Sequence, residues 1–96
     1  MTENAINHII RLIDTYDKLH ESTEECEKAL DAKMYNDEDY TDEEATWDIC
    51  YKFEIAALMD ASRAICLLTR RKVDIPTARQ MITDHREKLM EILNNA

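Results

Sequence analysis

Residues 41–72 read TDEEATWDICYKFEIAALMDASRAICLLTRRK, and this stretch decides the fold class. Between residues 49 and 68, apolar side chains cover more than half of the circumference of a helix. A helix with so wide an apolar arc lies at the centre of a bundle or at an interface between subunits. Thr41 and Glu44 have the spacing of a capping box, which predicts that the helix begins just after Thr41. The basic residues 70–72 suit the negative end of a helix dipole, so we expect the helix to extend to about residue 72.

Helical patterns flank this stretch on both sides. Residues 3–34 predict a long first helix, because apolar side chains recur at spacings of three and four: Ile6, Ile9, Ile10, Ile13, Tyr16 and Leu19. The pattern weakens at residues 21–23, which leaves a kink or a break open. Pro76 suits the first turn of a third helix that extends to about Asn94. Its apolar stripe comprises Ala78, Met81, Ile82, His85, Leu89, Ile92 and Leu93.

The composition points to the same fold class. The 96 residues include no glycine and one proline, whereas sheet-containing folds need glycine in tight turns. We therefore predict a single all-α domain over residues 1–96: an antiparallel hairpin of two long helices with a shorter C-terminal helix, resembling a three-helix bundle. The third helix can cover only part of the hairpin. The apolar surface left on residues 42–72 predicts a homo-oligomer, most simply a homodimer.

The sequence contains no pattern of a secretory leader or a membrane span, which predicts a cytoplasmic protein. Residues 1–4 have neither a basic nor an apolar leader segment, and the longest apolar run, residues 64–68, is far shorter than a membrane span. The three cysteines, Cys26, Cys50 and Cys66, are odd in number and lie in apolar helical patterns. Cysteines of this kind are typical of reduced thiols that act as small hydrophobic residues. We therefore expect a cytoplasmic protein without disulfides and without a membrane-bound segment.

Charge is distributed unevenly along the chain. Residues 21–48 contain twelve acidic and two basic residues, a net charge of −10, whereas the rest of the chain contains nine acidic and ten basic residues. The excess negative charge therefore lies at the end of the hairpin where the two long helices are joined. One interpretation is a solvated loop between helix ends, with acids placed favourably at the helix start. The other is a binding surface for a basic partner, since charge complementarity speeds association and selects partners.

We favour the second interpretation for the acidic tip, defined as residues 37–51. Direct binding of nucleic acid there is disfavoured, because phosphates would be repelled. The sequence predicts a non-enzymatic regulator or inhibitor that docks on a basic surface of a protein partner, for example a protein that handles nucleic acid. Tyr and Trp are favoured at interfaces, although those in the tip equally fit helix packing. The expected partner-binding residues are Asp37, Glu38, Asp39, Tyr40, Asp42, Glu43, Glu44, Trp47 and Tyr51.

A basic cluster forms the opposite pole and supports an alternative function. Arg63, Arg70, Arg71 and Lys72 offer guanidinium and ammonium groups that suit phosphate oxygens. A helical oligomer that binds or sequesters an anionic small molecule or nucleotide would use these side chains. Their simpler role is to compensate the helix dipole and to keep the protein soluble.

Catalytic and metal-binding patterns are weak. Glu24 and Glu27 resemble the paired acids of all-α nucleotide pyrophosphohydrolases, but those enzymes carry a further Glu-x-x-Asp motif that residues 42–72 lack. A metal-dependent nucleotide hydrolase is therefore the last alternative. The loop beginning at Asp37 has acids at the first and third positions of a calcium loop but lacks its glycine. We predict no catalytic residue, no metal site and no cofactor.

Overall fold

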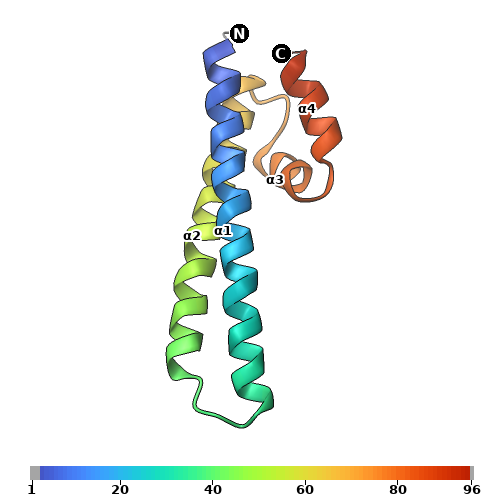
Figure 1. The fold of residues 1–96 in the computed structure, drawn as a ribbon. Coiled ribbons are helices and arrows are strands. Elements are labelled where there is room, and N and C mark those ends of the chain that lie inside the picture. Colours follow the sequence, from blue (N-terminus) through green and yellow to red (C-terminus); the bar gives the residue numbers. More distant parts are fainter. Residues whose placement is uncertain (1–2, 96) are drawn as a thin grey trace.

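The computed structural model describes residues 3–95, which form four helices (Figure 1). They are α1 (Glu3–Tyr35), α2 (Thr41–Leu68), α3 (Ile75–Asp84) and α4 (Arg86–Asn94). Helices α1 and α2 form a long antiparallel hairpin, and the two short helices pack at the end that carries both termini. The molecule is elongated, with extents of 53 × 20 × 17 Å. The all-α prediction and the hairpin of two long helices are confirmed.

The hydrophobic core lies in one half of the hairpin, which we call the base (residues 3–20 and 54–95). The apolar stripe of α1 contributes Ile9, Ile13 and Tyr16, as its spacing predicted. The other helices contribute the remaining core side chains: Leu58, Ala61, Ile65 and Leu68 from α2; Ala78, Met81 and Ile82 from α3; Leu89 and Leu93 from α4. Helices α3 and α4 thus cover only the base, and burial of these side chains is the main source of stability.

The other half of the hairpin, residues 21–53, projects away from the core, and we call it the arm. Helix α1 continues through residues 21–23 without a break. Thr23 is the one fully buried residue of the arm, and its hydroxyl donates to the carbonyl of Leu19 over 2.9 Å. The weak apolar pattern at residues 21–23 therefore reflects sparse packing against α2. The helix is nevertheless continuous, because its backbone hydrogen bonds do not depend on that packing.

The predicted single C-terminal helix is wrong, because the chain breaks at His85 into α3 and α4. His85 is exposed, with φ −131° and ψ 49°, so it is not part of the core stripe. The Arg86 guanidinium donates to the carbonyl of Ile82, through Nε over 3.0 Å and through Nη2 over 2.9 Å. The guanidinium thus takes the place of the backbone N–H that would donate to the Ile82 carbonyl in a continuous helix. The break lets Leu89 and Leu93 return to the core, where both are fully buried.

The ends of α2 also differ from the prediction. Thr41 is the first residue of the helix and not its cap: its N–H and hydroxyl donate to Oδ1 of Asp39 over 3.1 and 2.7 Å. At the other end, α2 stops at Leu68, and Arg70 and Arg71 adopt φ values of 55° and 62°. This left-handed region favours glycine, which the chain lacks. The turn is closed by a 2.7 Å bond from the Arg71 N–H to the Cys66 carbonyl. At α3 the prediction holds, since Pro76 lies in the first turn and Asp74 caps the Thr77 N–H at 2.8 Å.

Candidate partner-binding site

The predicted acidic residues lie together at the end of the arm, in the α1–α2 turn and the first turn of α2 (Figure 1). Five of them are exposed and one, Glu43, is half-buried; the set comprises Asp37, Glu38, Asp39, Asp42, Glu43 and Glu44. A single base balances them locally: Lys33 Nζ lies 3.3 Å from Glu38 and 3.8 Å from Glu43. The hydrogen bond with Glu38 raises the pKa of Lys33, so this cation stays charged. Six acids and one local base leave this surface with a net negative charge.

The turn that carries these acids is built from specific backbone bonds. Asp37 adopts φ 55°, a conformation that Asp tolerates better than most residues. The N–H of Glu38 donates to the carbonyl of Lys33 over 2.9 Å, which closes the C-terminus of α1. Two bonds from Thr41 lower the pKa of Asp39, so its carboxylate stays ionised. The turn thus fixes its backbone, and the carboxylates of Asp37, Asp42 and Glu44 are left to meet a partner.

The predicted aromatic residues flank the acids. The rings of Trp47 and Tyr51 stack with centroids 5.3 Å apart and an interplanar angle of 14°. Tyr51 and Tyr40 are exposed, whereas Trp47 is half-buried and its indole N–H is buried without an acceptor among residues 3–95. Two exposed side chains that the prediction did not include, Met34 and Tyr35, end α1 at the same place, and Tyr35 is 91% exposed. Their signal in the sequence was weak because the apolar stripe of α1 was already fading there.

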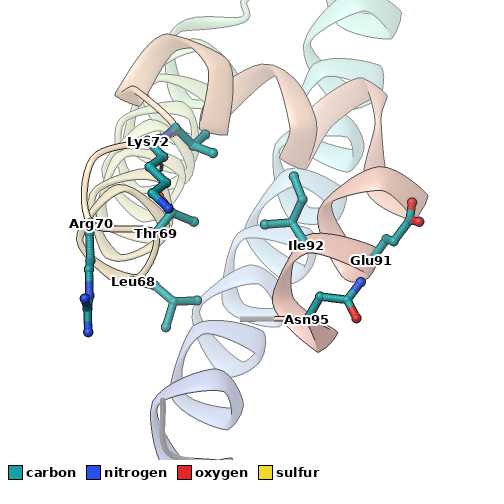
Figure 2. A pocket seen from close by; sticks show the side chains of 8 residues that line it. Leu68, Thr69, Arg70, Lys72, Glu91, Ile92 and Asn95 are labelled. Atoms are coloured by element: carbon teal, nitrogen blue, oxygen red, sulfur yellow. Dashed lines mark hydrogen bonds between the residues drawn. The ribbon is translucent and has the colours of Figure 1, made fainter.

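The basic residues of the alternative site do not all come together. Arg70 and Lys72 line a surface pocket of about 640 Å³ between the end of α2 and α4 (Figure 2). Glu91 and Ile92 of α4 and Asn95, which follows the helix, line its other side, so one carboxylate offsets part of the positive charge. Neither Arg71 nor Arg63 is among the lining residues. Arg63 is exposed on α2, with Nη1 3.7 Å from Asp60.

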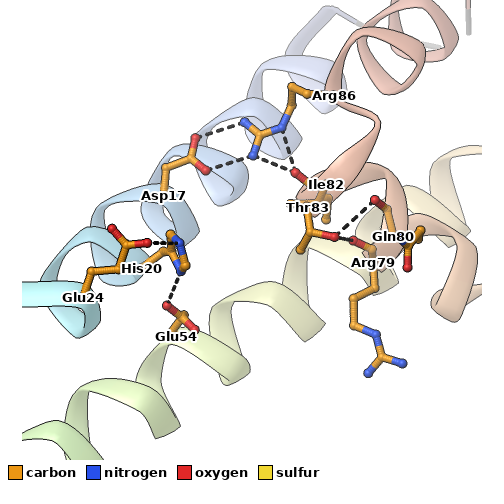
Figure 3. Close-up of polar contacts among 9 residues, drawn as sticks. All are labelled: Asp17, His20, Glu24, Glu54, Arg79, Gln80, Ile82, Thr83 and Arg86. Atoms are coloured by element: carbon orange, nitrogen blue, oxygen red, sulfur yellow. Dashed lines mark hydrogen bonds and ion pairs between the residues drawn. The ribbon is translucent and has the colours of Figure 1, made fainter. Parts of the chain in front are cut away.

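Two polar contacts that the sequence did not indicate hold the base together (Figure 3). Arg86 forms a two-pronged ion pair with Asp17, at 3.0 Å (Nη1–Oδ2) and 2.9 Å (Nη2–Oδ1). Glu54, only 7% exposed, lies 2.7 Å from His20 Nδ1, and His20 Nε2 lies 3.0 Å from Glu24. The hydrogen bond with Glu54 is the main cause that raises the pKa of His20. These residues belong to helix packing and have a structural explanation.

All three cysteines are free thiols, and two of them lie together. Cys26 of α1 and Cys50 of α2 face each other across the arm, with their sulfur atoms 3.4 Å apart. Cys66 lies in the base and forms no hydrogen bond to another sulfur in the described chain. The sequence did not reveal the pair because the register of the two helices depends on the length of the turn and the packing of the base.

Comparisons with known proteins give no family: no protein-family model, curated protein or solved structure matches the chain. None of the four helices is both long enough and apolar enough to cross a membrane. Among residues 3–95, no three or more His, Cys, Asp and Glu side chains are grouped as metal ligands. The function therefore has to be argued from the surface of this molecule.

Proposed function

We propose that this protein is a non-enzymatic binding protein that docks its acidic tip on a basic surface of a protein partner. The observation that carries the proposal is the placement of the charge. The acids are concentrated at the end of the arm, the half of the molecule without a hydrophobic core, and face solvent with Lys33 as the one nearby base. A fold does not need six acids at this turn, and their mutual repulsion has a cost. A positively charged partner would remove that cost on binding.

The aromatic side chains near the acids could provide binding affinity that charge alone does not. Tyr35, Tyr40 and Tyr51 are exposed at the end of α1, in the turn and on α2, respectively. Buried Tyr and Trp side chains provide much of the affinity of protein interfaces, whereas exposed ion pairs contribute mainly to association rate and selectivity. A basic groove that normally holds nucleic acid would complement such a surface, because it presents cations beside faces that accept rings. We therefore propose a regulator or inhibitor of a nucleic-acid-handling protein.

Affinity capture from a nuclease-treated lysate of the host tests this function. The bait is the tagged wild type, compared with a tip variant that combines Glu38→Gln, Asp42→Asn, Glu43→Gln and Glu44→Gln. A matched control removes four acids from the base instead: Glu3→Gln, Asp14→Asn, Glu87→Gln and Glu91→Gln. We expect one dominant, salt-sensitive protein partner that the wild type and the control capture and that the tip variant loses at least tenfold. Equal capture by all three folded baits would contradict the proposal.

The pocket between α2 and α4 supports a second candidate function, the binding of an anionic small molecule. Lys72 and Arg70 line the pocket, and its volume of about 640 Å³ is in the range of ligand sites. ATP can serve as the probe. We expect it to raise the melting temperature of the wild type and of Arg63→Ala, and to have no effect on Lys72→Ala. If ATP does not change the melting temperature of the wild type, nucleotide binding at this pocket is ruled out.

The uncovered face of α2 supports the prediction of a homodimer. Its exposed side chains recur at spacings of four and three: Ile49, Phe53, Ala56, Asp60, Arg63 and Leu67. If a second copy packs antiparallel about residue 58, Ile49 lies opposite Leu67 and Phe53 opposite Arg63. Arg63 can then stack on the phenyl ring of Phe53 in the other copy, and Asp60 lies opposite the small side chain of Ala56. We propose that two copies pair along this face.

The mass of the protein in solution tests the pairing. Light scattering after size exclusion should give a dimer for the wild type and for Lys52→Glu, whose side chain is exposed beside the stripe. It should give a monomer for Ile49→Glu, because a carboxylate would then face Leu67 of the second copy in the apolar contact. A wild type that is monomeric at high concentration would contradict this pairing without affecting the proposed role of the acidic tip.

A further inference from the structure

Cys26 and Cys50 form the one close contact between two sulfur atoms among residues 3–95. Their sulfur atoms lie 3.4 Å apart, although the two residues are 24 positions apart in the chain. A disulfide needs the sulfurs at about 2.0 Å, so they have to approach by roughly 1.4 Å. Little opposes this movement, because the surrounding arm contains no residue of the hydrophobic core. In a tightly packed core the same shift would meet strong resistance.

The pair is also accessible to small reagents. Both cysteines are half-buried, not fully enclosed. Cys26 lines a surface pocket of about 140 Å³ with Asp42 and Glu43, directly behind the acidic turn. Cys66, the matched cysteine of the base, lacks a sulfur partner among residues 3–95. Cys26 and Cys50 can therefore form an intramolecular disulfide, whereas Cys66 cannot.

We propose that Cys26 and Cys50 form a reversible redox pair that closes into an intramolecular disulfide by exchange with a low-molecular-weight disulfide. The thiolate of one cysteine attacks a sulfur of the small disulfide and displaces one small thiolate, which gives a mixed disulfide. The second cysteine, as thiolate, attacks the sulfur of the first and displaces the other small thiolate. Two protein thiols are thereby oxidised to one disulfide, and the small disulfide is reduced to two thiols. A dithiol reductant reverses the sequence.

Closure would act on the acidic tip. The bond would join α1 to α2 and enclose residues 26–50, which include the whole acidic turn and the start of α2. A crosslink restricts the unfolded chain most when it closes a long loop. In the folded state it would also hold the two helices of the arm together, where no core residue does so. Because the hydrogen bond with Cys50 and burial raise the pKa of Cys26, closure should become faster as the pH rises.

Peptide mapping and intact mass test the pair. The protein is equilibrated in glutathione buffers from fully reduced to fully oxidised, trapped with iodoacetamide and digested with trypsin without reduction. We expect a crosslink between peptides 19–28 and 34–52 with a mass about 2 Da below the sum of the two reduced peptides, and Cys66 outside the crosslink, either alkylated or carrying one glutathione. Cys66→Ser should oxidise identically, whereas Cys26→Ser should stop at a mixed disulfide. Oxidised Cys66→Ser should melt about 10 °C above its reduced form.

The outcomes that overturn the proposal are distinct. They are a Cys26–Cys50 pair that stays reduced in fully oxidised buffer, separate glutathione adducts on both Cys26 and Cys50, or disulfides that link separate chains. Mapping of the wild type needs no substitution, so an unstable variant does not affect the result. The redox pair also stands apart from partner binding, because the disulfide is read from the purified protein alone.

Discussion

The base and the arm of the hairpin are made from the same two helices but are held together in different ways. The base contains every residue of the hydrophobic core and is covered by α3 and α4. In the arm, Thr23 is the one buried residue, and the exposed apolar side chains Ile49 and Phe53 lie on the part of α2 that adjoins the base. Residues 21–48 also carry a net charge of −10, so the part with the least packing has the greatest charge repulsion.

This difference shows how stability and surface properties are divided along one hairpin. A chain of this size has a free energy of unfolding of about 5–15 kcal/mol, most of it from burial of apolar surface. In this molecule the base provides nearly all of that burial, which frees the arm to carry charge and exposed rings. Mutations that act through packing should therefore be costly in the base and mild in the arm.

The largest effect is expected from matched core and arm substitutions on α2. Ile65 is fully buried and Ile49 is 55% exposed, so the same change to alanine creates a cavity at one site and none at the other. We expect Ile65→Ala to lower the free energy of unfolding by about 2–5 kcal/mol. In protein dilute enough to be monomeric, Ile49→Ala should change it by less than about 0.5 kcal/mol. Urea titrations followed by circular dichroism give both values, and similar losses would show that the arm contributes to the core.

A smaller loss is expected when the ion pair that joins α4 to α1 is removed. Arg86 contacts both Asp17 and the Ile82 carbonyl, so Arg86→Ala removes a charged fork and leaves a helix end without its donor. Because the pair is partly exposed, we expect a loss of about 1–2 kcal/mol. Arg86→Lys should recover little of it, since an ammonium lacks the planar fork. Arg79→Ala on α3 is the control, and an equal loss there would contradict a specific role for Arg86.

These contacts also mark the limit of what the sequence predicts. The apolar spacings of α1 and α2 predicted the hairpin and most core residues, because periodicity depends on local geometry alone. The break at His85 was missed because it depends on Arg86 reaching Asp17, a residue 69 positions away. The capping-box pattern at Thr41 failed for a similar reason, since Asp39 provides the acceptor from the preceding turn.

The candidate site shows the same division between local and distant information. The clustering of acids at the tip followed from charge counts, because residues 37–44 are consecutive and need no tertiary packing to lie together. The basic cluster was less predictable: Arg70 and Lys72 share a pocket only because α4 packs beside the end of α2. The Cys26–Cys50 contact depends on helix register, which the sequence does not specify without the turn geometry.

A gain in stability is expected at the turn where α2 ends in the base. Arg71 adopts φ 62°, a region in which the Cβ atom of an L-residue is strained. We expect Arg71→Gly to raise the free energy of unfolding by about 1 kcal/mol, an increase of several degrees in the melting temperature. Arg71→Ala removes the same charge but keeps the Cβ atom, so it should show no gain. Asp37→Gly in the arm should gain less, because Asp tolerates φ 55°.

The smallest effect is expected at the boundary between base and arm, where His20 contacts Glu24 and Glu54. The folded state raises the pKa of His20 above its ordinary value of 6.5, so the imidazolium stabilises the fold below that pH. The contribution is lost as the pH rises through the folded-state pKa. Tyr16, which stacks on His20, has its pKa raised above 10.0 and does not titrate in this window.

Melting temperatures at pH 6 and pH 9 measure this contribution as a difference between the wild type and His20→Gln. The wild type should exceed the variant at pH 6, and the gap should narrow at pH 9 as the imidazole becomes neutral. Since half of the His20 side chain is exposed, solvent screening keeps the effect within about 1 kcal/mol. Glu24→Gln should narrow the gap at pH 6 less than Glu54→Gln, because Glu54 is the buried partner. A gap that does not change with pH would show that His20 acts through packing, and the boundary would then be held in the same way as the base.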